Sequence, residues 1–306
     1  MTKPPFWRDQ RFWYIAGQLI AVFVVAIVVT ILLSNLSRNL QQLGLQFGFD
    51  FLNQQASFDI GETVVSYQPS DTYSRALWVG LVNSLRIAIT GIILTTIVGV
   101  FAGVARLSDN WLVRNIALIY VEIFRNTPLL LQLLFWYFAV FLTFPKTENK
   151  ISIWGLVGFS QNGIQLPWFT LSPEFSTLLL GLTLYTGAFI TEIVRGGIQS
   201  VSRGQWEAAR SLGLKPVLIM RLVIFPQALR VIIPPLTSQY LNLTKNSSLA
   251  IAVGYPDLYF VASTTFNQTG KAVEVMLLLT LTYLILSLTI SLVMNWFNRT
   301  VQIKER

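Results

Sequence analysis

The 306-residue chain contains no cysteine and no histidine. Without cysteine no disulfide framework can form, and the redox compartment stays undetermined. Without either residue the chain lacks thiolate and imidazole metal ligands, and it cannot build a Ser-His-Asp or Cys-His catalytic set. We therefore expect no metal site and no enzymatic activity.

Charged residues are also scarce. They make up 12% of the chain, against 53% hydrophobic residues, and the mean hydropathy is +0.58. A soluble domain carries about 25% charged residues, so much of this surface must face lipid. The net charge of +8 does not require a nucleic-acid partner, because membrane proteins collect Lys and Arg in their cytoplasmic loops.

Several apolar segments reach the length of about 20 residues that a spanning helix needs. We expect an all-α, multi-pass membrane protein with spans at residues 12–34, 76–104, 115–144, 175–194, 224–253 and 272–297. The first apolar run is too long for a signal peptide and has no small-residue cleavage site, so we interpret it as an uncleaved helix. Pro234 and Pro235 are expected to break the fifth span.

The distribution of Lys and Arg predicts the orientation of the spans. If the N-terminus lies inside, 13 Lys and Arg residues fall in internal segments and 5 in external ones. The positive-inside rule then places both termini in the cytoplasm. Residues 36–75 and 145–173 become external segments, and Trp154 and Trp168 in the second suit the membrane interface.

The internal loop between the fourth and fifth expected spans contains a short helical pattern. Residues 205–212 favour a helix, and Gly213 is placed to end it in a left-handed conformation. Ala208 and Ala209 would offer a small face that a partner protein can approach, flanked by Trp206, Glu207 and Arg210. The alternative is an ordinary charged helix of a cytoplasmic loop.

The same loop resembles the EAA loop of bacterial ABC importer permeases. The family pattern is E-A-A, three residues, Gly, nine residues and I-x-L-P. It is matched by Glu207-Ala208-Ala209, Gly213 and residues 223–226, with Val and Phe replacing Ile and Leu. The resemblance implies a type I ABC importer permease fold. It also implies a coupling helix that docks on an ATP-hydrolysing subunit, with contributions from Glu207, Ala208, Ala209, Arg210 and Gly213.

Two further segments narrow the resemblance to polar amino-acid ABC permeases. Residues 124–132 look like F-R-G-T-P-L-x-x-Q, with Asn126 in place of Gly, and residues 243–250 look like L-K-x-[ST]-S-L-A. The extra first span and residues 58–62 resemble the corresponding features of the permeases in the branch that imports a broad range of L-amino acids. We expect an N-terminal helix with its external segment at 1–75, and a permease domain at 76–306 whose coupling loop lies near 203–215.

Ionisable and polar residues inside spans are candidates for a substrate pathway, because a charge at membrane depth is costly. Glu122 and Arg125 share one helical face, with Gln132 seven residues on. We expect them to form a polar stripe along the pathway; the alternatives are an internal ion pair, or side chains that snorkel near the cytoplasmic end of the span. Irregular backbone lines a cavity or is buried in protein. We therefore expect a second group after the proline break, where Lys245 meets a substrate carboxylate or snorkels outward. This group comprises Lys245, Asn246, Ser247 and Ser248.

Three glycines of the second expected span, Gly91, Gly99 and Gly103, fall on one stripe. Small residues let helices approach closely in a membrane. We interpret the stripe as a packing surface, either within the chain or toward another subunit.

The chain has no G-x-x-x-x-G-K-[ST] motif, so it does not bind ATP in the usual phosphate loop. We expect a permease subunit of an ABC importer for L-amino acids in the bacterial inner membrane, working by alternating access and without a cofactor of its own. Its expected partners are ATP-binding subunits, a second permease subunit, a periplasmic binding protein and lipid. The alternative is an ion-gradient-driven carrier, although no cluster of membrane carboxylates suggests a proton relay.

Overall fold

The computed structural model describes residues 10–42, 44, 46–153 and 156–301. It divides into two compact units, Met1–Phe49 and Asp50–Arg306. The first unit holds α1 (Gln10–Gln42), whose apolar side chains are exposed along the helix, as expected for a lipid-facing span. Trp154, and four of the 13 Lys and Arg residues counted as internal, lie outside the described residues; these four are Lys3, Arg8, Lys304 and Arg306.

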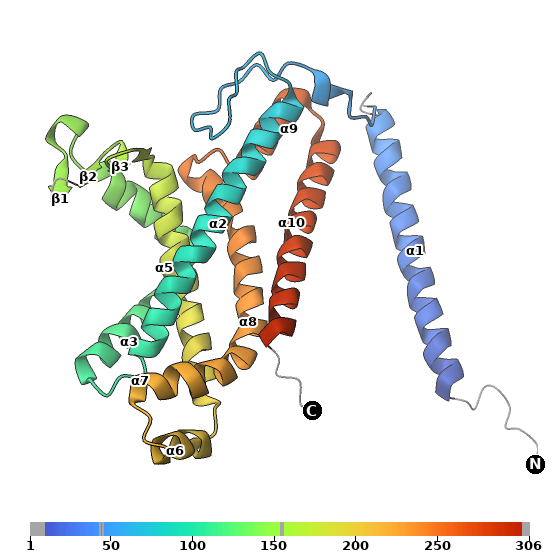
Figure 1. Ribbon diagram of the computed structural model, residues 1–306. Helices are drawn as coiled ribbons and strands as arrows, with labels where there is room; N and C mark the ends of the chain where they lie inside the picture. Colours follow the sequence, from blue (N-terminus) through green and yellow to red (C-terminus); the bar gives the residue numbers. More distant parts are fainter. Residues whose placement is uncertain (1–9, 43, 45, 154–155, 302–306) are drawn as a thin grey trace, which may run out of the picture. The chain divides into compact units, whose positions relative to one another are not determined.

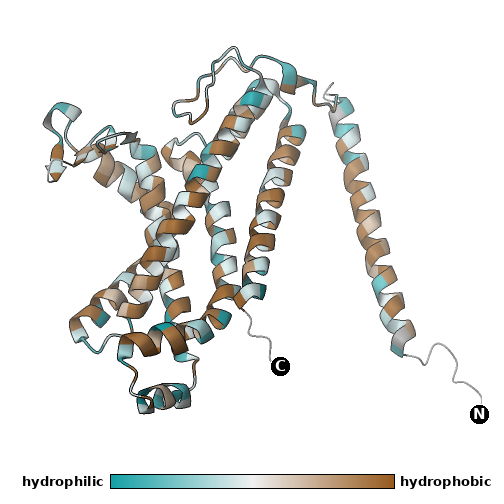
Figure 2. Ribbon diagram, viewed as in Figure 1, coloured by the Kyte–Doolittle hydropathy of each residue, from teal (hydrophilic) through white to brown (hydrophobic). Residues whose placement is uncertain are grey.

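The second unit is a helical bundle with a small sheet (Figure 1). Its α-helices are α2 (Tyr73–Ala105), α3 (Trp111–Asn126), α4 (Leu129–Leu134), α5 (Pro173–Gln199), α6 (Arg203–Ser211), α7 (Pro216–Ile219), α8 (Phe225–Asn246), α9 (Leu258–Thr269) and α10 (Ala272–Val301). Residues 50–72 lie at one end of this unit, called here the hairpin end, and α6 lies at the other, called the α6 end. Hydrophobic residues dominate α2 and α10, whereas α6 is largely hydrophilic (Figure 2).

Short helical segments of other pitch connect these helices. The 3-10 segments are η2 (Asp50–Asn53), η4 (Phe141–Thr143), η5 (Thr147–Asn149) and η7 (Ser247–Val253), and the π-helical segments are η3 (Phe135–Val140) and η6 (Met220–Ile224). In the described residues, five helices are long and apolar enough to cross a membrane, or six if the bent pair at 111–143 counts as one span. The expectation of about six spans is therefore confirmed.

The third expected span is not one straight helix. It bends by 106° between α3 and the helical segment Leu129–Thr143. Pro128 lacks an N–H, and its ring keeps the preceding residue out of the helical region. Thr127 accordingly takes an extended conformation, with φ −111° and ψ 136°.

The fifth expected span is also irregular, but the predicted position of the break was wrong. Helix α8 runs without interruption through Pro234 and Pro235, while neighbouring Ile233 and Leu236 are buried in the core. Packing of this kind keeps a helix together across proline in a membrane. The chain leaves the α-helix only at Asn246, passes through η7 and the left-handed Gly254, and resumes as α9. Helix α9 was not predicted.

The expected external segment 145–173 contains a sheet that the sequence did not indicate. Its strands are β1 (Ile151–Ile153), β2 (Val157–Ser160), β3 (Gly163–Gln165) and β4 (Thr170–Leu171), joined antiparallel in that order. Phe159 pairs with Ile151 on one side and Ile164 on the other. Strands of two to four residues are too short to display an alternating pattern. Trp168 precedes β4 and is 89% exposed.

The core of the second unit is organised around the contact of α2 with α5. Gly99 and Gly103 face α5, where an added Cβ would lie 2.5 Å from a side-chain atom of Ile190 and 2.7 Å from one of Val194. The glycine stripe therefore packs within the chain, rather than forming a subunit interface at these two positions. One buried cluster continues from Ile190 and Val194 into Ile224, Ala228 and Ile232 toward the α6 end.

Gly103→Ala should lower the unfolding temperature of the purified permease, because the new methyl group would also lie 3.0 Å from the carbonyl oxygen of Thr191. The matched control is Gly196→Ala, since a Cβ at that exposed helical position meets nothing within 4 Å. Alanine should be neutral or stabilising there, because glycine disfavours a helix. Equal unfolding temperatures for the two variants would contradict the assigned close packing.

Candidate functional site

The loop at the α6 end has the local structure that its sequence predicts. Helix α6 is followed by Gly213 with φ +74°. The Leu214 N–H donates to the carbonyl of Ala209 at 3.3 Å, and the Gly213 N–H donates to that of Arg210 at 2.9 Å. This pair of bonds is a Schellman cap, in which glycine avoids the Cβ penalty of the left-handed conformation. The predicted role of Gly213 as the helix stop is confirmed.

The two alanines of α6 face different environments. Ala208 is exposed, whereas Ala209 is 3% exposed and belongs to the buried cluster, with Trp206 and Leu214 packed against it. Ala209 is therefore buried within the chain rather than exposed beside Ala208, and Trp206 is half-buried. An exposed surface remains, made of Glu207, Ala208 and Arg210.

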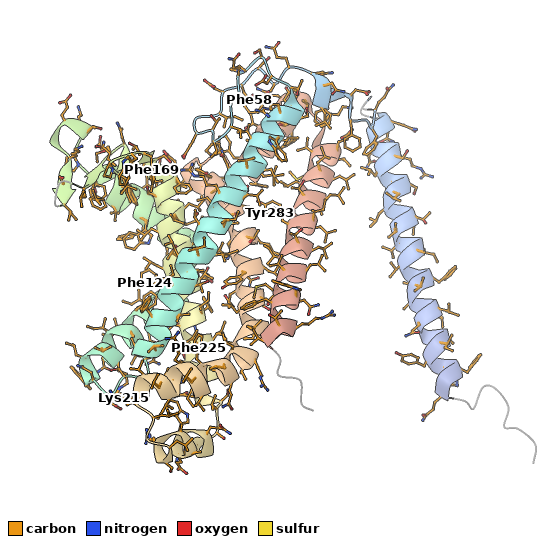
Figure 3. The ribbon with its side chains drawn as sticks, in the orientation of Figure 1. Phe58, Phe124, Phe169, Lys215, Phe225 and Tyr283 are labelled. Carbon is orange, nitrogen blue, oxygen red and sulfur yellow. The ribbon has the colours of Figure 1, made fainter. Side chains whose placement is uncertain are left out.

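Helix α6 is attached to the helix that follows it. The Gln227 side chain in α8 donates to the Gln205 side chain at 3.2 Å and also to the backbone carbonyl of Val223 at 2.9 Å. Lys215 lies at the start of α7 and Phe225 at the start of α8, so the route from α6 into α8 is short (Figure 3). Helix α6 is therefore linked to α8 both through the short connecting segment and through this side-chain hydrogen bond.

A second candidate group surrounds the bend between α3 and α4. The Gln132 amide nitrogen donates to the carbonyls of Phe124 and Thr127, each at 3.0 Å, and to the Thr127 hydroxyl at 2.7 Å. These two carbonyls have lost their helical partners at the bend. Gln132 is 7% exposed, and its amide oxygen has no hydrogen-bond partner. It therefore repairs the broken backbone.

The charged residues of this group do not form the alternative ion pair. The Glu122 carboxylate accepts from the Asn126 amide at 2.9 Å, and the Arg125 guanidinium lies 5.1 Å from the ring centre of Phe189. Both charged side chains are exposed. A pocket of about 420 Å³ opens at the bend, with almost wholly apolar walls that include Ile123, Leu131 and Phe135.

The third group lies at the end of α8 and in η7. Lys245 is exposed and Asn246 half-buried, whereas Ser247 is buried and donates to the carbonyl of Thr244 at 2.8 Å. The half-buried Ser248 donates to the carbonyl of Lys245 at 2.7 Å. The two serine hydroxyls therefore satisfy backbone carbonyls at the irregular end of α8.

The exposed face of α8 carries two polar residues that the sequence reasoning missed. Ser238, Asn242 and Lys245 are all exposed and follow one another at intervals of four and three. This spacing places them on one stripe of the helix, called here the α8 polar stripe. The helical spacing backward from Lys245 was the signal that would have found Ser238 and Asn242.

The fold brings two of the sequence motifs together. Leu129 and Leu133 of α4 share a buried cluster with Ala250 and Val253 of η7. The charged side chains remain apart: within the described chain, no hydrogen bond or ion pair joins Lys245 to Arg125 or Glu122. No group of three or more acidic residues that could hold a metal ion occurs among the described residues.

Residues 95–303 match a family described as the binding-protein-dependent transport system inner membrane component. Among curated proteins, the chain is 40% identical to the putative amino-acid ABC transporter permease protein YhdX of Escherichia coli (strain K12), over 94% of each chain. It is 36% identical to the general L-amino acid transport system permease protein AapQ of Rhizobium johnstonii, over 97% of this chain and 94% of the relative.

Among solved structures, the chain is similar to one from the crystal structure of an amino acid ABC transporter with histidines. The TM-score is 0.60 at 28% identity, and the match covers 74% of this chain and 95% of the other. The fold is that of a type I ABC importer permease. The chain belongs to the family of binding-protein-dependent transport system inner membrane components, which are transport permeases and not enzymes. The resemblance to amino-acid ABC permeases is confirmed.

Gln132→Leu should lower the unfolding free energy by about 1–3 kcal/mol, because the Phe124 and Thr127 carbonyls would lose their side-chain donor. Denaturant unfolding of the purified chain measures the loss, and Leu131→Ala at the neighbouring exposed position should cost less. Wild-type stability in Gln132→Leu would show that the side chain does not hold the bend.

Proposed function

We propose that this chain is the permease subunit of an ABC importer that carries L-amino acids by alternating access. The observation that carries this proposal is the exposed surface of α6, which lies beyond the spanning helices and is attached to α8 by Gln205 and Gln227. The names of the relatives, which are amino-acid permeases, support the substrate class.

In this proposal α6 is the coupling helix. Glu207, Ala208 and Arg210 contact the ATP-hydrolysing subunit, while Ala209 anchors the helix in the permease core and Gly213 ends it. A short helix that is exposed on one side and buried on the other can transmit a push from a partner. The permease itself needs no cofactor, because ATP binds to the partner subunit.

The α8 polar stripe is the proposed wall of the substrate pathway. Hydroxyl, amide and ammonium groups at membrane depth are costly unless they face water or another protein. Lys245 has no ion-pair partner among the described residues, so its ammonium group is available for a substrate carboxylate. Arg125, Glu122 and Gln132 on α3 and α4, and Asn246, Ser247 and Ser248 beyond Lys245, complete the proposed lining.

The proposed assembly contains a second permease subunit, homologous or identical, because about six helices are few for one pathway. Both termini lie in the cytoplasm of a bacterium, and the ATP-binding subunits act at the α6 end. A periplasmic binding protein delivers the amino acid at the hairpin end. An ion-gradient-driven carrier remains the rival function, and it has no use for an exposed coupling helix.

Glu207→Lys should abolish uptake of radiolabelled L-amino acids and copurification of the ATPase subunit, because it reverses the charge of the coupling surface. The experiment uses intact cells that carry equal amounts of inserted protein. The matched control is Asp109→Lys, which makes the same change of charge at an exposed position between α2 and α3. This control should retain both properties.

Two outcomes would contradict the proposal in different ways. Uptake that survives Glu207→Lys and follows a proton or sodium gradient would favour the rival carrier. Loss of both properties in Asp109→Lys as well would indicate a general sensitivity of this end to positive charge.

Lys245→Met should reduce uptake at least tenfold without weakening ATPase association, since one charge-assisted hydrogen bond to a carboxylate contributes on the order of 1.5–3 kcal/mol. Lys245→Arg should recover part of the uptake, because it keeps the positive charge. Unchanged uptake in Lys245→Met would show that Lys245 does not contribute to the pathway, and would favour the alternative in which its side chain snorkels outward.

A further inference from the structure

An ion pair joins Arg86 of α2 to Glu62, which lies in the segment that precedes α2. Arg86 lies in α2, about 20 Å along the helix from Tyr73 at 1.5 Å per residue. Its guanidinium donates to the Glu62 carboxylate at 2.5 Å. The exposed fractions of the two side chains are 27% and 21%, so both are largely removed from the surface.

The Glu62 carboxylate is held on both of its oxygens. Arg86 binds one oxygen, and the Ser172 hydroxyl donates to the other at 2.5 Å. The ring of Phe175 lies against the Arg86 guanidinium, 3.9 Å from its central carbon. These three side chains together can bind one carboxylate group. Arg86 and Ser172 donate hydrogen bonds to it, and the Phe175 ring orients the guanidinium.

The segment that delivers Glu62 is fixed at its base and open at its tip. Gln55 and Thr72 form a β-bridge, and the Ala56 N–H donates to the carbonyl of Asp71 at 2.8 Å. The base of this hairpin lies above α2, near the labelled Phe58 (Figure 3). At the tip, Gly61, Thr63, Val64 and Ser66 are exposed.

Three side-chain attachments hold the tip. Glu62 pairs with Arg86. Arg75 donates to the carbonyl of Ser66 at 2.8 Å. The Glu62 backbone carbonyl also accepts from the Asn83 amide at 2.8 Å. A movement confined to the tip would therefore withdraw the carboxylate without unfolding the base of the hairpin.

We propose that Arg86 and Ser172 form a carboxylate-binding site, and that Glu62 is an exchangeable occupant of it. When the tip moves, a free carboxylate takes the place of Glu62, because a desolvated guanidinium without a partner is strongly unfavourable. The ligand class is an amino acid bound through its α-carboxylate. This last assignment rests on the proposed function, whereas the carboxylate site itself does not.

The test is chemical rescue of Glu62→Ala in the full-length chain purified in detergent. The variant should unfold at a temperature roughly 2–4 °C below that of the wild type. Sodium acetate, compared with sodium chloride at equal concentration, should restore most of this difference, because acetate fills the vacated site. Acetate should affect the wild type much less, since the tethered Glu62 carboxylate competes with it for the site.

The double variant Glu62→Ala with Arg86→Gln should show no acetate effect, because the guanidinium is gone. An acetate effect no larger in Glu62→Ala than in the wild type would overturn the proposal and leave a static tether.

L-Alanine should rescue as acetate does, and L-alaninamide should not. Rescue by acetate but not by L-alanine would overturn the assignment to amino acids. None of these readouts depends on uptake or on an ATPase, so failure of the proposed transport function would be seen separately.

A second measurement covers the case in which Glu62→Ala does not accumulate. The chain has no cysteine, so Ser172→Cys introduces a single thiol inside the site while Glu62 stays in place. In intact cells, L-alanine should slow labelling of this thiol by a sulfonate-bearing thiol reagent severalfold, and L-alaninamide should not. Equal labelling rates in the two solutions would contradict an exchangeable occupant.

Discussion

A polar group at membrane depth must find its partner within the protein, because lipid offers none. Most of the backbone meets this requirement by remaining helical. The two places where the helices of the second unit break show what else is needed. At the bend after α3, the Gln132 side chain supplies donors to the carbonyls of Phe124 and Thr127. The bend is therefore stabilised by the buried side-chain amide of Gln132.

The break between α8 and α9 is repaired by side chains of other elements. The Asn83 amide in α2 donates to the carbonyl of Pro256 at 2.9 Å, and the Ser84 hydroxyl accepts from the Leu258 N–H at 2.9 Å. Asp257 caps α9 by accepting from the Phe260 N–H at 2.8 Å. Helix α2 thus supports the irregular segment while its glycines hold α5. The pairing of Arg86 with Glu62 satisfies a charge on the same helix.

Polar groups that have no partner within the chain are therefore candidates for contacts with a substrate or with another subunit. The α8 polar stripe and the exposed surface of α6 are two regions where the described chain presents polar side chains outward. The sequence motifs predicted both regions, through Glu207 and Lys245. They did not predict which side of each helix is exposed. Whether Ala209 points inward depends on how α6 packs against α7 and η6, and a nine-residue segment carries no such information by itself.

The sequence alone determined the number and approximate position of the spans, because the thickness of the bilayer imposes their length and hydropathy. It also determined the end of α6, since Gly213 adopts a left-handed conformation at little cost. The proline pair misled it, because packing of Ile233 and Leu236 outweighs the missing hydrogen bonds of Pro234 and Pro235. Only the tertiary structure decided that Glu62 meets Arg86 and Ser172. These partners lie 24 and 110 residues away along the chain, and such contacts arise from the folded path of the backbone rather than from any local pattern.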